Sequence, residues 1–267
     1  MESPPLDVKL IRSKIGTYPI GRNFQYFESI ASTNTKAYDL VRSGTPLPCL
    51  VTAEEQTGGK GRLRRTWFSP FRKGLWITSA LSSRSNTDKT GHYNFFISLS
   101  AALAIENMTD LNVEFKWPND ILISGKKVCG ILSECISGDA SNPVMITGIG
   151  LNVHINIEEF GEEYRAKATS LLIETGKQIE RSRLFIEFVD CMNTVYATWS
   201  RNGIESIYRE WVKRCTTPGQ EVTINSGNVS LSGTAITVNS DGSLVVQSAQ
   251  GKTRTVYAGD LEYKVAD

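Results

Sequence analysis

Residues 116–132 read KWPNDILISGKKVCGIL, and this stretch does most to decide how the chain folds. Its Ser124-Gly125-Lys126 segment is a turn sequence between two short apolar runs, which predicts a β-hairpin. Just before the hairpin, Lys116 to Asp120 place a cation, an aromatic ring, an amide and a carboxylate around a proline. These residues either form a turn closed by a salt bridge from Asp120 to Lys116, or they face a ligand.

Two features near this hairpin are typical of strands that a ligand approaches. Lys127 begins the second strand, and most lysines are solvated at the surface, so a lysine that faces a pocket is uncommon. Gly130 follows three residues later, and Gly148 and Gly150 interrupt the strand predicted over 144–153. Glycines inside strands allow a ligand or another backbone to come close.

The remaining periodicity predicts a mixture of helices and paired strands. Residues 1 to about 25 have only weak periodicity and are assigned no element, and residues 184–199 carry one apolar helical stripe that we assign to the core. The other predicted elements are a helix from Ser32 or Thr33 to about Arg42, strands over 48–53, 74–81 and 113–136, and helices over 95–108 and 204–213.

The character of the sequence changes at Thr217-Pro218-Gly219. From Glu221 onward, short β-branched runs alternate with turn sequences, which is typical of a small β-barrel or sandwich. We therefore predict two domains, covering residues 1–217 and 218–267.

Composition narrows the class of protein. Among the 267 residues, 40% are hydrophobic and 21% charged, and no apolar run approaches the ~20 residues that span a bilayer. The N-terminus is not a signal peptide, and five scattered cysteines favour a reducing compartment over disulfides or zinc. His92 and His154 are the only histidines and belong to no recognisable ligand set, so no protein-bound metal is expected.

A net charge of +1 gives no general attraction to nucleic acid or membrane, but one stretch is strongly basic. Residues 60–73 contain six basic side chains and no acidic one, which favours a small anionic ligand over a polyanion. The glycines of Gly58-Gly59-Lys60-Gly61-Arg62 fit neither the Walker A pattern nor GxGxxG. The stretch is either a solvated loop or a phosphate-binding loop, and Trp67 either packs in the core or stacks on a purine.

Ser32-Thr33-Asn34 has two interpretations as well. It is an ordinary helix N-cap, or its three adjacent polar side chains bind a ring with both donors and acceptors, such as a cyclic urea.

The order of these motifs resembles the biotin protein ligase family. Ser-Thr-Asn is followed by Gln56-x-x-Gly-Lys-Gly-Arg, Trp67, KWPND, Lys127-x-x-Gly130 and Gly148-x-Gly150-x-Asn152. The resemblance runs from about Phe27 to Val153. The family's small C-terminal β-domain matches residues 221–267 in character.

The resemblance implies a class II synthetase-like biotin/lipoate ligase fold, with a mixed, largely antiparallel sheet flanked by helices and a C-terminal SH3-like β-barrel. It implies a cytoplasmic enzyme that uses ATP, with Mg²⁺ on the substrate phosphates, to form biotinyl-5′-AMP. Biotin then passes to a lysine of a biotin carboxyl carrier protein or domain. A homodimer is also possible, and no nucleic-acid or membrane partner is expected.

The family's roles transfer to named positions here. By similarity, Lys127 holds the biotin carboxylate, and Lys127, Arg62 and Lys116 are the catalytic candidates. The ureido end of biotin is assigned to Ser32, Thr33, Asn34 and Gln56. The adenylate side is assigned to Gly59, Lys60, Gly61, Arg62, Arg65 and Trp67. The remaining binding positions are Asn119, Asp120 and Asn152 near the phosphates and their Mg²⁺, and Gly130 and Gly148 on the strands.

Two positions depart from the family's loop sequence, and two alternative functions compete with the biotin ligase assignment. Lys60 stands where arginine is usual and lacks its planar fork, and Arg64 stands where glycine is common.

Only about thirty residues precede Ser32, too few for a helix-turn-helix domain, so we expect no repressor function. The rivals are a lipoate or octanoate ligase and a non-catalytic RNA-binding module.

Overall fold

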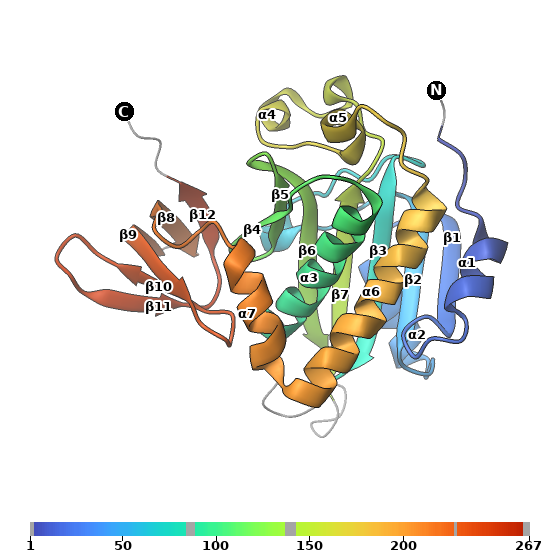
Figure 1. Ribbon diagram of the computed structural model, residues 1–267, viewed down its shortest axis with the longest axis horizontal. Helices are drawn as coiled ribbons and strands as arrows, with labels where there is room; N and C mark the ends of the chain where they lie inside the picture. Colours follow the sequence, from blue (N-terminus) through green and yellow to red (C-terminus); the bar gives the residue numbers. More distant parts are fainter. Residues whose placement is uncertain (1–2, 84–88, 137–142, 227–228, 264–267) are drawn as a thin grey trace.

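The computed structural model describes residues 3–83, 89–136, 143–226 and 229–263, and its centre is a seven-stranded sheet (Figure 1). The strand order is β1-β2-β3-β7-β6-β5-β4, with β1 and β2 parallel and every other pair antiparallel. This confirms the predicted mixed, largely antiparallel sheet. The strands are β1 (Asn23–Ile30), β2 (Cys49–Gln56), β3 (Gly74–Ser82), β4 (Glu114–Lys116), β5 (Asp120–Ile123), β6 (Lys126–Ile136) and β7 (Val144–Asn152).

The predicted hairpin is present between β5 and β6. Its turn residues Ser124 and Gly125 have positive φ angles of 52° and 72°. Glycine adopts this conformation without strain, so the Ser-Gly sequence fits the turn.

Helices cover one face of this sheet. Figure 1 shows α3 (Thr90–Met108) and α6 (Arg181–Asn202) lying across it, with α7 (Ile204–Arg214) beside them. The apolar stripe of α6 is buried as predicted, from Leu184 to Trp199. Helix α2 (Thr33–Arg42) instead packs on β2, β3 and β7 with a separate cluster that contains Ala37, Val51 and Ile146.

Alternation along β7 separates the two faces. Ile149 and Leu151 belong to the large core that also contains residues of α3 and α6, whereas Ile146 belongs to the cluster around α2. Because successive side chains of a strand point to opposite faces, Gly148 and Gly150 lie on the face with Ile146. Because glycine has no side chain, the backbone of β7 is uncovered by β7's own side chains at these two positions. They lie between the α2 cluster and a third cluster formed by Trp76, Ile155 and Phe160.

The N-terminal segment is ordered by a buried ion pair, which weak periodicity could not predict. Arg181 donates to Glu54 at 2.7 Å, and both side chains are almost fully buried. Arg181 also donates to the carbonyl of Pro4, and Glu54 accepts from the backbone N–H of Leu6. These bonds fix the chain that leads into α1 (Val8–Ile15).

A short helical segment follows β7 and was also not predicted. It contains η2 (Ile157–Glu159), α4 (Glu162–Arg165) and α5 (Leu171–Thr175). Its backbone joins β6, because Lys127 N–H donates to the carbonyl of Lys167 and Thr169 N–H donates to the carbonyl of Lys127. The segment thereby reaches the start of β6.

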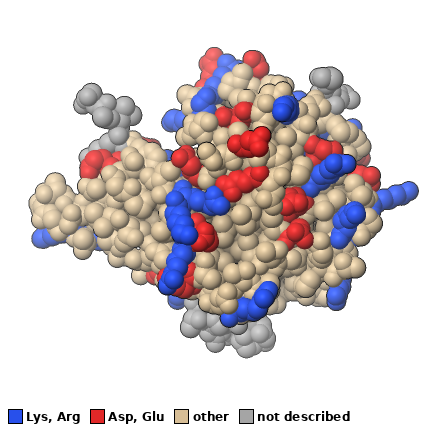
Figure 2. Space-filling view, viewed as in Figure 1, with Lys and Arg blue, Asp and Glu red and all other residues tan. Residues whose placement is uncertain are grey.

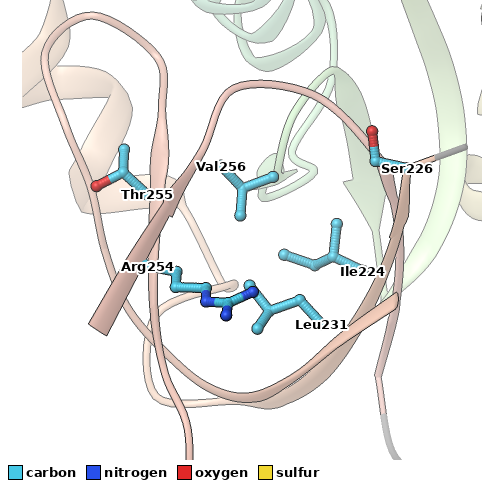
Figure 3. A pocket seen from close by; sticks show the side chains of 6 residues that line it. All are labelled: Ile224, Ser226, Leu231, Arg254, Thr255 and Val256. Atoms are coloured by element: carbon cyan, nitrogen blue, oxygen red, sulfur yellow. The ribbon is translucent and has the colours of Figure 1, made fainter. Parts of the chain in front are cut away.

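After Thr217 the chain forms a five-stranded antiparallel sheet, in the order β11-β10-β9-β8-β12, as the β-rich pattern predicted. A cavity of about 190 Å³ lies within it, lined by Ile224, Leu231, Arg254 and their neighbours (Figure 3). None of the expected site residues lines this cavity. The strands are β8 (Glu221–Ser226), β9 (Val229–Val238), β10 (Leu244–Gln247), β11 (Thr253–Val256) and β12 (Asp260–Tyr263).

Charges on the helix-covered face are mixed. Figure 2 shows basic and acidic side chains interspersed there, and α7 carries ion pairs such as Arg209–Glu205 and Lys213–Glu210. The cations Arg209 and Lys213 of α7 are therefore paired with acidic neighbours on the same helix. Within the described ranges, we find no helix whose length and apolar content would let it cross a bilayer.

We predict that Arg181→Met destabilises the fold by about 3–5 kcal/mol, because it leaves the Glu54 carboxylate buried without its cation. Denaturant unfolding measures the free energy directly. Arg183→Met is the matched control on the same helix, since Arg183 is exposed and pairs only with Glu180. Its expected effect is within about 0.5 kcal/mol. Equal losses in the two variants would contradict the structural role of the buried pair.

Candidate functional site

The strand register assembles one continuous row of site residues. Gly150 lies opposite Gly130, Gly130 lies opposite Asp120, and Asp120 lies opposite Lys116. Side chains that are directly opposite on neighbouring strands share a face of the sheet. The two glycines thus form a floor beside the acidic and basic side chains of the KWPND segment.

Lys127 and Asp120 form the central ion pair of this row, with Nζ and Oδ1 2.6 Å apart. Arg62 reaches the same place from the basic loop and donates to Asn119 Oδ1 at 3.1 Å. Burial lowers the pKa of the Arg62 guanidinium, which the carboxylates of Asp120 and Asp260 partly offset. Two cations from distant parts of the sequence therefore meet beside one carboxylate.

Of the two interpretations of residues 116–120, the turn closed by a salt bridge from Asp120 to Lys116 is not observed. Their Cα atoms are paired across the β4–β5 turn, but the Asp120 carboxylate binds Lys127 instead. The Lys116 ammonium lies over the ring of Tyr263, 4.4 Å from its centroid. Burial lowers the pKa of Lys116, and the nearby carboxylate of Asp120 opposes that shift.

Trp67 covers the glycine floor. A Cβ at Gly150 would lie 2.1 Å from the indole Nε1, and one at Gly130 would lie 2.9 Å from Cζ3. Lys127 Nζ lies over the indole, 5.1 Å from a ring centroid. The indole N–H is buried and has no hydrogen-bond partner among the described residues. Trp67 is therefore packed against the site, with a polar group that a ligand could satisfy.

A second, uncharged polar cluster lies next to this row on the same face. Asn34 covers Gly148, whose added Cβ would lie 2.2 Å from Asn34 Oδ1. Thr33 donates to Gln56 Oε1 through both its backbone N–H and its hydroxyl, at 2.8 and 2.9 Å. Because Gly148 and Gly150 are two residues apart, this cluster and Trp67 are separated by roughly 7 Å along the strand.

Two uncharged members of this cluster, Thr78 and Ser69, and the Glu134 carboxylate at its edge were missed by the sequence analysis. Thr78 Oγ1 bonds to Asn34 Oδ1 at 2.7 Å and lies 2.8 Å from Thr33 Oγ1. Ser69 accepts from Gln56 Nε2 at 2.9 Å, and Glu134 accepts from Asn34 Nδ2 at 3.0 Å. Only the period-two alternation of β3 could have drawn attention to Thr78, since it places that hydroxyl on the glycine face.

The basic loop does not bring all of its cations to the site. Lys60 Nζ donates to Thr35 Oγ1 at 2.9 Å, and Arg65 forms an ion pair with Asp260 of β12. Gly59 is packed under the loop, where a Cβ would lie 2.4 Å from the carbonyl oxygen of Trp67. Gly61 N–H donates to the Arg65 carbonyl at 2.7 Å, which closes the loop around η1 (Arg62–Arg64).

Two further predicted residues have structural contacts. Asn152 is buried at the end of β7 and donates to the carbonyl of Thr169 at 3.0 Å. Ser32 is buried at the N-cap of α2 but makes no capping hydrogen bond with its side chain. Both therefore lie at the margins of the site, and the simple N-cap interpretation of Ser32 is not supported by a capping bond.

The assembled site can hold a ligand that is polar and neutral at one end and anionic at the other. The Thr33, Asn34 and Gln56 cluster offers donors and acceptors, and Lys127 and Arg62 offer positive charge. No cluster of three or more His, Cys, Asp or Glu side chains suited to a metal occurs in the described parts of the chain.

Comparison with known proteins places the sequence among ligases. The model of the biotin/lipoate A/B protein ligase family matches residues 26–152, and the model of the biotin protein ligase C-terminal domain matches residues 217–262. A bifunctional ligase/repressor of Bacillus spizizenii is 29% identical over 252 residues, covering 94% of this chain and 77% of that protein. A biotin–[acetyl-CoA-carboxylase] ligase of Mycobacterium tuberculosis is 28% identical over 268 residues, covering 97% and 96%.

Solved protein structures share the fold of this chain. The structure of a biotin protein ligase from Aquifex aeolicus, in complex with biotin and ATP, superposes with a TM-score of 0.78. It is 24% identical in sequence, and the match covers 92% of this chain and all of that chain.

We predict that Gly150→Ala displaces Trp67, because the new Cβ would overlap the indole. Acrylamide quenching of tryptophan fluorescence measures this. The other four tryptophans, Trp76, Trp117, Trp199 and Trp211, are almost fully buried, so a rise in quenching reports on Trp67. Adding Trp67→Phe to the Gly150→Ala variant should abolish the rise. Unchanged quenching in folded Gly150→Ala protein would contradict the packing of Trp67 on this glycine.

Proposed function

Because the chain belongs to the biotin protein ligase family, we propose that its glycine-floored site joins biotin to AMP and then passes biotin to a lysine of a carrier protein. The chain is an ATP-dependent ligase that carries both the family's ligase region and its C-terminal domain. The proposal for the individual residues rests on one observation. The uncharged polar cluster around Thr33 and the cations Lys127 and Arg62 lie side by side on the face of the sheet that carries Gly148 and Gly150.

The polar cluster suits the ureido ring of biotin. A cyclic urea carries two N–H donors and one carbonyl acceptor, and Thr33, Asn34 and Gln56 offer both kinds of partner. With the ring held there, the valerate chain runs past the Trp67 indole, which covers the glycine floor, toward Lys127. The Lys127 ammonium then binds the carboxylate, and Trp67 packs along the ligand.

The first half-reaction joins two anions. A carboxylate oxygen of biotin attacks the α-phosphorus of ATP, the bond to the β-phosphate bridging oxygen breaks, and pyrophosphate leaves. Lys127 and Arg62 lower the repulsion between the carboxylate and the phosphates, and they stabilise the negative charge in the transition state. Catalysis is then mainly positioning and charge stabilisation, with no covalent bond to the enzyme.

Mg²⁺ enters this reaction as part of the substrate. Asn119 and Asp120 are the oxygen donors nearest the proposed phosphate position, and Asp120 is already paired with Lys127. Two protein oxygen donors are enough for Mg²⁺, because this ion usually takes most of its ligands from substrate phosphates and water.

The second half-reaction transfers the acyl group. The neutral amine Nζ of the carrier lysine attacks the biotinyl carbonyl carbon, the bond from that carbon to the phosphate oxygen breaks, AMP leaves, and the amine gives up one proton to solvent as the amide forms. We propose a biotin carboxyl carrier domain as the acceptor. The ligase is then expected where such carriers are made, and a reducing cytoplasm suits its five free cysteines. A homodimer stays a prediction.

We also propose that the chain divides at residues 217 and 218. Before this point, all seven strands belong to the large sheet, and after it the described strands belong to the small one. The large part would hold biotin and ATP. The small sheet would contact the site through the ion pair between Arg65 and Asp260.

The assignment predicts that purified protein with Mg²⁺-ATP and biotin yields biotinyl-AMP, detectable by mass spectrometry. Lys127→Ala should lower the initial rate of formation at least 100-fold, since the carboxylate loses its cation inside a low-dielectric site. Lys126→Ala is the matched control from the same hairpin, because Lys126 has no ion pair or ring contact with any described residue. Normal adenylate yield from folded Lys127→Ala protein would remove Lys127 from the mechanism.

Replacing biotin with lipoate in the same assay distinguishes a biotin ligase from the rival lipoate ligase. Lipoyl-AMP alone would reassign the enzyme as a lipoate ligase. A folded protein that forms neither adenylate would overturn the proposed function.

Arg62 should govern how long the adenylate stays bound. We predict that Arg62→Ala raises the release rate of biotinyl-AMP about tenfold or more, because the phosphate loses a charge-assisted hydrogen bond. Rapid gel filtration of enzyme loaded with radiolabelled adenylate measures that rate. Arg64→Ala is the matched control, since Arg64 is an exposed neighbour in the same loop. An unchanged release rate for Arg62→Ala would count against its role.

A further inference from the structure

Among the described residues, Lys116 contacts an aromatic ring and forms an ion pair with no carboxylate. Its ammonium lies 4.4 Å from the centroid of Tyr263, and the carboxylate opposite it in the strand register, Asp120, is engaged by Lys127. A cation–π contact attracts an ammonium without using its N–H donors. Lys116 is therefore oriented while its donors stay available to an anion.

Tyr263 is itself fixed to the segment that carries Lys116. The Tyr263 hydroxyl lies 3.3 Å from Thr217 Oγ1. Thr217 Oγ1 also accepts a hydrogen bond from the backbone N–H of Trp117 at 3.0 Å. The Trp117 indole in turn donates to the carbonyl of Gly242, in the turn between β9 and β10, at 2.9 Å. The Tyr263 ring and hydroxyl thus join β12, and the indole joins the β9–β10 turn, to the segment that carries Lys116.

Lys116 lies within electrostatic reach of the proposed phosphate site. Its charge interacts with Asp120 on β5, Lys127 on β6, Glu262 on β12 and Lys167 after α4. An ammonium in this position, desolvated and not neutralised by a direct ion pair, is suited to bind a phosphate oxygen of ATP.

We propose that Tyr263 is a positioning residue for Lys116, and that through this contact the C-terminal sheet takes part in binding the ATP phosphates. The inference rests on the proposed function and extends it to a residue outside the large sheet. Tyr263 does not touch the reacting atoms. It fixes the direction of the Lys116 ammonium and favours its charged form.

The test compares Tyr263→Leu with Tyr263→Phe in the full chain. Tyr263→Leu should raise the dissociation constant for Mg²⁺-ATP about tenfold, by calorimetry without biotin, because the ring contact is lost. Tyr263→Phe keeps the ring and should stay within about threefold of the original protein. Tyr257→Leu is the matched control, because Tyr257 is a highly exposed tyrosine of the same C-terminal region.

A pH profile separates positioning from a merely structural role. Burial already lowers the pKa of Lys116, and the ring favours the charged ammonium, so losing the ring lowers this pKa further. ATP affinity should therefore decline at a lower pH in Tyr263→Leu than in the original protein. Tyr263→Phe should decline at the original pH, although it also removes the titration of the tyrosine hydroxyl.

Either equal losses in the Phe and Leu variants, or no loss in a folded Leu variant, would overturn the proposal. If Tyr263→Leu does not fold, stepwise fluorinated phenylalanines at position 263 provide the same test. They weaken the attraction for a cation with little change of shape, so ATP affinity should fall as fluorination increases. A constant affinity across the series would refute the inference. Because ATP binding is measured alone, failure to form biotinyl-AMP would count only against the proposed function.

Discussion

Gly130 and Gly150 lie opposite each other on the two central strands of the large sheet, and the site depends on this pairing. Neither residue has a side chain, so the indole of Trp67 packs on the backbone of both strands. The same hydrogen-bonded register places Asp120 beside Gly130 and Lys116 beside Asp120. A shift of one residue would turn these side chains to the helix-covered face and bring large apolar residues to the site.

The cations in and beside the site have different kinds of partner. Lys127 pairs with Asp120, Arg65 of the neighbouring basic loop pairs with Asp260, and Lys116 lies over the Tyr263 ring. An incoming phosphate must compete with a carboxylate for the first two cations, whereas the ring leaves the donors of the third available. The arrangement keeps several positive charges close together in the free protein, because each one has an attractive neighbour.

The small sheet is attached to the large one at residues 116–120, the segment that also borders the candidate site. Trp117 is fully buried, with its backbone bonded to Thr217 and its indole bonded to Gly242. Phe115 stacks on Trp211 of α7 at 5.3 Å, with an interplanar angle of 11°. The KWPND segment is therefore both a structural anchor and a border of the site, so changes in the small sheet can reach Lys116 without crossing the large core.

The sequence by itself determined the hairpin and the change to a β-rich region after Thr217, and it named most of the residues that the structure brings together at the candidate site. These are encoded locally, in turn residues, alternating patterns and the order of short motifs. It did not show that Thr78 and Ser69 join the polar cluster with the Glu134 carboxylate at its edge, that Asp120 pairs with Lys127, or that Lys116 lies over the Tyr263 ring. Such contacts join residues far apart in the chain or on different strands. They are fixed only when strand register and the packing of the two sheets decide which side chains meet.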